Sequence, residues 1–383
     1  MLSGCPIPPS SLTVPACPGL GTDFFLGPGV LRTARTHSYL RHAGDPSVRL
    51  LRIFSLDPAV SRLEGSITTV SVPYEPLAPG PVGALLAVDN YDTAQGVHYR
   101  RADLDSPAVL ICDGYAPSPT DPRFHQQMVY AVCMRIAGAF RQALGREITW
   151  GFQRADDDGV SPLRLTIRPH AVDAQNAWYD KVAGELCFGY YLATIDTAGR
   201  NLPGSYVFTC LSHDIVVHEM THALLDGLRA QLSFPSGPDT IAFHEGFADL
   251  IALFQHFSYD QPLFNAIQKS RGDLLSATLL TDLAKQFGQT TAGQSALRSA
   301  VDSQEIYDSD MEAHRLGSVL ASAIFSAFNT IFQRKTARYF KLATGGTGVL
   351  ASGDTSPSFQ TVLAKEAAIL AQQFSNIIIR AIE

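Results

Sequence analysis

The sequence contains no uninterrupted run of eighteen apolar residues, so it predicts no membrane-spanning helix. It also lacks an excess of basic residues, because 36 Asp and Glu outnumber 29 Lys and Arg and give a formal net charge of -7. A chain with this balance has no broad basic surface for phosphates, so neither a nucleic acid nor an anionic membrane is expected as a partner. An apolar content of 46% over 383 residues is enough for two or three folded domains.

No secretory signal is recognisable in the sequence. Met1 to Gly21 has no basic n-region and no apolar h-region, and it is rich in Pro, Ser and Gly. The six cysteines show no paired spacing, which suits free thiols in a reducing compartment better than a disulfide framework. They are Cys5, Cys17, Cys112, Cys133, Cys187 and Cys210. We therefore expect a cytoplasmic protein, with export by a route that uses no cleavable signal as the alternative.

Two common catalytic or binding motifs are absent. No Gly-x-Ser-x-Gly sequence predicts a serine nucleophile on a strand-to-helix turn. The glycine-rich stretch 345–348 lacks the Lys-Ser/Thr that completes a phosphate-binding loop, so a surface turn is expected there.

One motif that is present carries most of the information. His218 and His222 lie four residues apart in the stretch 212–225, whose apolar pattern predicts a single helix, and Glu219 follows the first histidine. Side chains four apart share one face of a helix, so the two imidazoles can bind one metal ion, most commonly zinc. Glu219 is placed to accept a proton from water. The alternative is a chance HExxH on an ordinary helix, with both histidines solvated or packed.

A second helix is predicted over 243–254, after a Pro- and Gly-containing loop. Glu245 and Asp249 are again four apart, beside an apolar stripe that would pack in the core, and a buried carboxylate is costly unless it is paired or binds a metal. Two histidines leave a tetrahedral zinc in need of one more protein ligand, for which Glu245 is the natural candidate. Asp249 would then accept the free N–H of a ligand imidazole. The alternative is a carboxylate that stabilises the positive end of the helix dipole.

On these residues the chain resembles the thermolysin-like, gluzincin-type zinc metallopeptidases, which combine HExxH with a Glu ligand in an ExxxD motif. The resemblance implies that His218, His222 and Glu245 bind Zn2+, that Glu219 is the general base, and that Asp249 orients a ligand. The residue before Glu245 is His244, at a place where the family has a polar residue that reaches toward a ligand histidine. A role for His244 in orienting His222 is therefore one reading.

The resemblance extends to the stretch Asn176-Ala177-Trp178-Tyr179, which matches the family's edge strand. In that family this strand pairs with the substrate backbone, so Asn176 and Ala177 are expected to bind an extended peptide or protein substrate. Without the resemblance, Asn176 is simply a turn residue before a short strand.

A third match lies further along the chain. His314 opens the apolar helical run 313–325. The resemblance places it where the family has a histidine that donates to the oxyanion of the tetrahedral intermediate. Asp308 or Asp310 is expected to hold the imidazole, and Arg315 is a second candidate donor. The alternative is a surface histidine near a helix start.

The expected fold class is α+β, a thermolysin-like zincin with a β-rich upper lobe, an HExxH helix at the cleft and a mainly α-helical lower lobe. The predicted regions are a Pro/Gly-rich β-containing region over 1–120, a catalytic lobe over 121–258 and a helical lobe over 259–383. The first region is expected to supply strands to the catalytic lobe, and the sequence also predicts a helix over 121–145 and a strand near 147–153.

The expected function is hydrolysis of peptide bonds by a zinc endopeptidase. One alternative keeps the zincin scaffold but serves as a binding or toxin-like module with weak or lost catalysis. An aminopeptidase is another, although no acidic motif for gripping a substrate amine is evident in the sequence.

Overall fold

The computed structural model describes residues 34–58, 66–152, 161–193, 203–234, 236–277, 282–283, 298–299, 306–308, 310–350 and 356–383. The predictions for Cys5, Cys17 and the rest of the first 33 residues lie outside these ranges. The described cysteines are all free thiols: Cys112 is exposed, whereas Cys133, Cys187 and Cys210 are buried.

The described part of the chain is a mixed α+β structure, which confirms the predicted fold class at this level. The α-helices are α2 (Pro107–Leu110), α3 (Pro122–Leu144), α4 (His213–Leu228), α5 (Pro238–His256), α6 (Asp260–Ser270), α9 (Ala313–Ala343) and α10 (Pro357–Arg380). Short 3-10 helices are η2 (Thr209–Leu211), η3 (Ala230–Ser233) and η4 (Leu274–Ser276). The strands are β1 (Val48–Phe54), β2 (Ile67–Pro73), β3 (Leu86–Val88), β4 (Tyr91–Asp92), β5 (Val97–His98), β6 (Leu165–Asp173), β7 (Ala177–Asp180), β8 (Glu185–Leu192), β9 (Tyr206–Phe208), β10 (Asp282–Leu283) and β11 (Arg298–Ser299).

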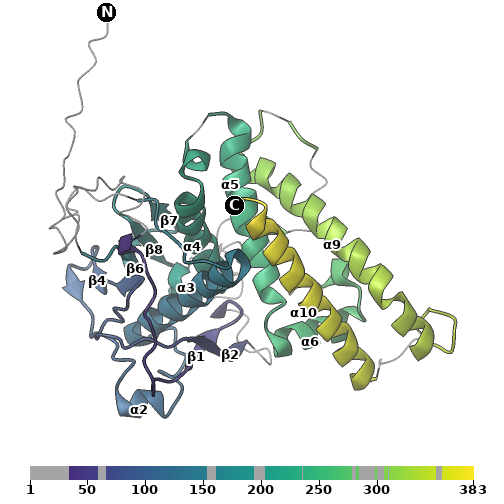
Figure 1. Cartoon of the computed structure of the whole chain (residues 1–383), viewed down its shortest axis with the longest axis horizontal. Helices are drawn as coiled ribbons and strands as arrows, with labels where there is room; N and C mark the ends of the chain where they lie inside the picture. Colours follow the sequence, from purple (N-terminus) through teal and green to yellow (C-terminus); the bar gives the residue numbers. More distant parts are fainter. Residues whose placement is uncertain are drawn as a thin grey trace, which may run out of the picture.

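Helix α3 forms where the sequence predicts it. The Asp121 side chain accepts a hydrogen bond from the backbone N–H of Arg123 at 2.9 Å, which caps the first turn, and Gly145 ends the helix in the left-handed conformation at φ 68°. The helix packs against β1, β2 and β6 as well as against α4 and α10, so it lies between the strands and the other helices. Figure 1 shows this arrangement, with most strands on one side of α3 and with α5, α9 and α10 on the other.

The main sheet has the strand order β3-β6-β8-β7, with β9 also paired to β8. Strands β3, β6 and β8 run parallel, whereas β7 and β9 run antiparallel to different stretches of β8. Among the described residues no strand pairs with the outer side of β7, so its backbone is the free edge of the sheet beside α4. Strand β3 belongs to this sheet and pairs with β6, so the region before residue 120 supplies a strand to the sheet that the later strands form.

Two predictions of local structure need correction. Residues 147–152 form no strand, although Ile148, Trp150 and Phe152 are buried and alternate with partly exposed neighbours. This segment packs against the end of α4 instead, where Thr149 Oγ1 donates to the carbonyl of Gly227 at 3.0 Å. The helical region after residue 259 also contains the antiparallel pair β10–β11. The division of the chain into three regions stays a prediction.

Helix α9 is the one helix of the described residues that is long and apolar enough to cross a membrane by length and composition. In its most apolar eighteen-residue window, 39% is buried within the protein. The helix packs against α5 and α10 and places Phe325, Phe328 and Phe332 in the main core, a pattern that core helices of globular proteins also show.

Candidate metal centre

Helix α4 carries a single polar stripe through the core. Asp214, His218, His222 and Asp226 follow one another at intervals of four residues, and each has at most 9% of its surface exposed. Side chains at this spacing stand one above another on a helix face. Buried polar groups need partners. The side chains of other elements that contact this stripe therefore show which groups form the site.

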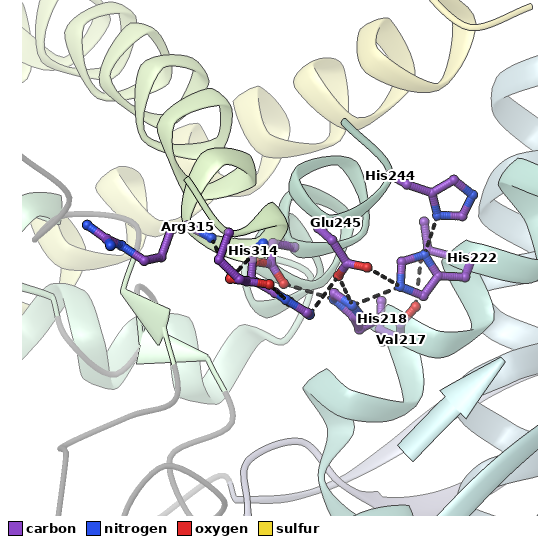
Figure 2. Close-up of polar contacts among 10 residues, drawn as sticks. Val217, His218, His222, His244, Glu245, His314 and Arg315 are labelled. Atoms are coloured by element: carbon purple, nitrogen blue, oxygen red, sulfur yellow. Dashed lines mark hydrogen bonds and ion pairs between the residues drawn. The ribbon is translucent and has the colours of Figure 1, made fainter. Parts of the chain in front are cut away.

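Two histidines of the stripe and one carboxylate of α5 converge. His218 Nε2 lies 3.0 Å from His222 Nε2 and 3.1 Å from Glu245 Oε2, while His222 Nε2 lies 3.7 Å from Glu245 Oε1 (Figure 2). Ligand bonds of about 2.0–2.1 Å in a tetrahedral zinc site correspond to ligand separations of about 3.3–3.4 Å. The three side chains, predicted from sequence as ligands, are therefore spaced to hold one metal ion.

Charge supports this arrangement. Burial alone would raise the pKa of the Glu245 carboxyl, but the hydrogen bond with His218 and the proximity of His222 lower it well below its usual range. Glu245 is therefore a carboxylate, the form that binds a metal.

Asp249 lies where the sequence predicts it. His218 Nδ1 donates to Asp249 Oδ1 at 2.9 Å, and the carboxylate is 3% exposed. A proton fixed on Nδ1 leaves the lone pair of Nε2 directed at Glu245 and His222, which is the tautomer a ligand needs.

His244 backs the second ligand in the same way. Its Nδ1 lies 2.6 Å from Nδ1 of His222, and the two rings stack with centroids 4.7 Å apart. If His222 Nε2 keeps a lone pair for a metal, its Nδ1 carries the proton and His244 Nδ1 accepts it. The proton of His244 then lies on Nε2, a buried atom that has no hydrogen-bond partner among the described residues. This geometry fits the reading that His244 orients His222.

Glu219 follows His218 on α4 and is 7% exposed. Successive residues of a helix are about 100° apart around its axis. The side chain of Glu219 therefore projects from the helix face next to the stripe, not from the stripe itself. The role of Glu219 as a general base stays a prediction.

His314 reaches the same centre from α9. Its Nε2 lies 3.2 Å from Glu245 Oε2, its Nδ1 lies 2.6 Å from Glu312 Oε1, and 49% of its side chain is exposed. The predicted partners Asp308 and Asp310 were wrong, because Glu312 holds the ring.

Glu312 also caps α9. Its carboxylate accepts from the backbone N–H groups of His314 and Arg315 at 3.0 and 3.2 Å. The Glu312 carboxylate thus caps the first turn of α9 and also holds the His314 imidazole. Arg315 points away from Glu245 in Figure 2, so the site contains one candidate oxyanion donor on this helix.

The expected substrate strand is present but is not part of the ligand cluster. Ala177 begins β7 and pairs with Phe188 of β8, and Asn176 is exposed just before it. Asn176 Oδ1 accepts from the backbone N–H of Ala177 at 2.9 Å. Both residues thus lie at a free sheet edge, the position that strand addition requires.

Two contacts were not predicted from the sequence. Asp226, at the C-terminal end of the stripe, accepts hydrogen bonds from Tyr179 and Lys181, which lie on and just after β7. The sequence pattern that could have indicated Asp226 is its spacing of four residues from His222, which places both on one helix face. The other is a close crossing of α5 and α9 at Gly246 and Gly317, which no sequence pattern indicated.

Two other buried groups have the donor atoms for a metal: His213–Asp214–His256 and His125–His170–Cys210. In the first group, Asp214 Oδ1 accepts from His256 Nε2 at 2.5 Å and lies 3.4 Å from His213 Nδ1, while Tyr259 donates to His213 Nε2 at 2.6 Å. These hydrogen bonds satisfy the first group internally, so it is a buried polar network.

In the second group, His125 Nε2 donates to the carbonyl of Pro119 at 3.1 Å, so its Nδ1 accepts from His170 Nε2 at 2.8 Å. Burial lowers the pKa of both histidines, to about 3 for His125 and to about 4 for His170. Both rings are therefore neutral near pH 7.

Of the three groups found in the described residues, the cluster of His218, His222 and Glu245 combines ligand spacing with a half-exposed histidine, His314, beside it. No protein-family model matches the chain, and no curated protein matches it either.

Proposed function

We propose that the chain is a zinc-dependent endopeptidase that hydrolyses peptide bonds with water, as its sequence resemblance to the thermolysin-like metallopeptidases implies. The observation that carries the proposal is the convergence of His218, His222 and Glu245 at ligand spacing, with Asp249 on the far nitrogen of His218. Two imidazoles and one carboxylate suit zinc, and a set of three protein ligands is typical of catalytic rather than structural zinc.

A zinc ion held by these residues would polarise the scissile carbonyl and make water more acidic. Glu219, directly after His218, then accepts the proton of the attacking water and passes it to the leaving amine. Its burial favours this role, because proton transfer to a carboxylate is easier where bulk water does not solvate the charge.

His314 supplies the hydrogen bond that the developing oxyanion needs. Both of its ring nitrogens face carboxylates, Glu312 on one side and Glu245 on the other. An ionised carboxylate can only accept a hydrogen bond, so each of these carboxylates favours an N–H on the ring nitrogen that faces it. A fixed donor of this kind is worth about 10²–10³ in kcat for acyl chemistry.

The free edge of β7 would hold the substrate. An extended peptide can add to this edge through its backbone, which fixes the register of the scissile bond without regard to sequence. In this proposal the Asn176 side chain gives up its hydrogen bond with the N–H of Ala177. The side-chain amide of Asn176 then turns toward the peptide and hydrogen-bonds to it.

The test compares the wild type with Glu219→Gln on a peptide library, with metal content measured in the same samples. Glu219→Gln removes the proton acceptor but no ligand, so one zinc per chain and loss of hydrolysis are expected. Glu366→Gln is the matched control: Glu366 on α10 accepts from Tyr339 and is expected to leave cleavage unchanged. Full activity in Glu219→Gln would overturn the assignment. Zinc and peptide binding without cleavage by the wild type would support a binding module instead.

A further inference from the structure

Asp226 is the most buried polar residue of the α4 stripe and lies one turn beyond the ligand His222. Its side chain has no exposed surface. Both carboxylate oxygens have partners: Oδ2 accepts from Tyr179 Oη at 3.0 Å, and Oδ1 accepts from Lys181 Nζ at 2.6 Å. A buried carboxylate with one charged and one neutral donor is held in a single orientation.

The two donors lie on and directly after β7, the strand that the proposed substrate would pair with. Tyr179 is the third residue of β7, and Lys181 follows its last residue. Side chains alternate across a strand, so Tyr179 lies on the same face as Ala177. The pKa of the Tyr179 hydroxyl is raised by burial and by Asp226, so it remains protonated and can donate.

The surroundings of Asp226 leave it no room to turn. A Cβ on Gly151 would lie 2.4 Å from Asp226 Oδ2, and a Cβ on Gly227 would lie 1.8 Å from the carbonyl oxygen of Thr149. The segment 149–151 therefore lies directly against the carboxylate and the end of α4. The Lys181 ammonium also lies over the Phe234 ring, 5.2 Å from its centre.

We infer that Asp226 is a positioning residue that fixes the substrate-pairing edge of β7 relative to the metal ligands on α4. The inference rests on the proposed function. Since His222 and Asp226 share one helix face, the ligand and the strand anchor move as one body. A peptide added to β7 is then delivered to the ligands in a constant register, and a shift of about 1 Å in such a register can cost about 10²-fold in rate.

This role has a signature that a general stabilising role does not have. Substrates long enough to pair with β7 depend on the position of the strand, whereas a blocked dipeptide that occupies only the reacting centre does not. Loss of Asp226 should therefore change the ratio of kcat/KM between long and short substrates, and it should leave metal content unchanged.

The experiment uses the full chain with Asp226→Asn, Lys181→Met, Lys181→Arg and the double variant Asp226→Asn/Lys181→Met. Asp226→Asn keeps an oxygen for Tyr179 but loses the charge that pairs with Lys181. We expect kcat/KM for a quenched ten-residue peptide to fall by about 10- to 100-fold and that for a blocked dipeptide by less than about 3-fold. Lys181→Met should act similarly, Lys181→Arg should retain most activity, and the double variant should lose little more than either single one.

Glu366→Gln is again the matched control, because Glu366 contacts Tyr339 and Lys335 between α9 and α10 with the same chemistry. Equal losses on long and short substrates, or no loss on either, would overturn the inference.

A second measurement needs no turnover. In the Glu219→Gln background, affinity for the ten-residue peptide should fall by about 10-fold on adding Asp226→Asn, and amide hydrogen exchange should rise at 177–180 but not in α4. Unchanged affinity and exchange would overturn the inference. A wild type that cleaves no peptide would overturn the proposed function, which is a separate result.

Discussion

A Cβ placed on Gly246 would lie 2.5 Å from the carbonyl oxygen of Gly317, so helices α5 and α9 cross here with their backbones in contact. Gly246 directly follows Glu245, the predicted ligand on α5, and Gly317 lies three residues after His314. The crossing thus sets the 3.2 Å separation between Glu245 and His314.

Gly317→Ala tests this relationship. Its Cβ would lie 2.7 Å from both the Ala242 carbonyl oxygen and the Gly246 backbone nitrogen, and backbone atoms cannot yield as side chains do. We expect α9 to move outward, kcat/KM to fall by about 10- to 100-fold and the free energy of unfolding to fall by about 1–3 kcal/mol, with metal content retained. Gly237→Ala, at the residue directly before α5, is the control, because a Cβ there meets nothing within 4 Å. Peptide cleavage kinetics and urea unfolding measure both effects, and wild-type activity in Gly317→Ala would contradict them.

The part of the site that could be predicted from sequence is the part governed by helix periodicity. His218 with His222, and Glu245 with Asp249, are pairs at a spacing of four, and that spacing alone places each pair on one face. The remaining step, bringing the two faces together, followed from the cost of burying carboxylates without partners.

What could not be predicted depends on contacts between segments distant in sequence. Glu312 holds His314 because it caps α9, and the sequence offered Asp308 and Asp310 as equally plausible acids. Apolar residues alternate with others over 147–152, which is typical of a strand, but the segment packs on the end of α4 instead. Local patterns do not reveal which surface a segment meets.

Removal of the metal should destabilise the folded chain. A ligand that binds only the native state stabilises it by RT ln(1 + [L]/Kd), about 4 kcal/mol at a thousandfold excess over Kd. We therefore expect a chelator to lower the Tm of the zinc-loaded protein, and excess zinc to restore it. In His218→Ala/His222→Ala the chelator should have no effect on Tm, as measured by differential scanning calorimetry. An equal shift in that variant would show that the metal binds elsewhere.

The buried pair His125–His170 should make stability depend on pH. Burial lowers the pKa of these histidines from 6.5 to about 3 and about 4, so the unfolded chain binds protons below pH 6.5 that the folded chain does not. Stability is therefore complete above pH 6.5 and falls as pH drops toward 4, by about 1.4 kcal/mol per pH unit for each histidine.

Urea unfolding at pH 7.5 and pH 5 measures this loss. His125→Gln should reduce the difference in unfolding free energy between the two pH values by about 2 kcal/mol. His42→Gln, at an exposed histidine, serves as the control. An unchanged pH dependence in His125→Gln would contradict the assignment.

The network at the N-terminal end of α4 should hold the two ligand helices together. Asp214 lies one turn before His218, and its partner His256 lies seven residues after Asp249 on α5. Burial would raise the pKa of Asp214, but His256 and His213 lower it well below its usual 3.8. The stability that this carboxylate contributes is thus fully present above pH 3.8 and is lost only as pH falls below that value.

Asp214→Asn removes the charge but keeps the shape, and His256 then loses its ionised partner in the core. We expect the free energy of unfolding to fall by about 3–5 kcal/mol at pH 7, as when a buried ion pair is broken. Asp260→Asn is the matched control, since Asp260 is also an acidic residue in the first turn of a helix but is exposed, and should cost less than about 1 kcal/mol. Urea unfolding of the chelator-treated proteins separates this effect from metal binding. Equal costs for the two substitutions would mean that the network contributes no more than a surface carboxylate at a helix start.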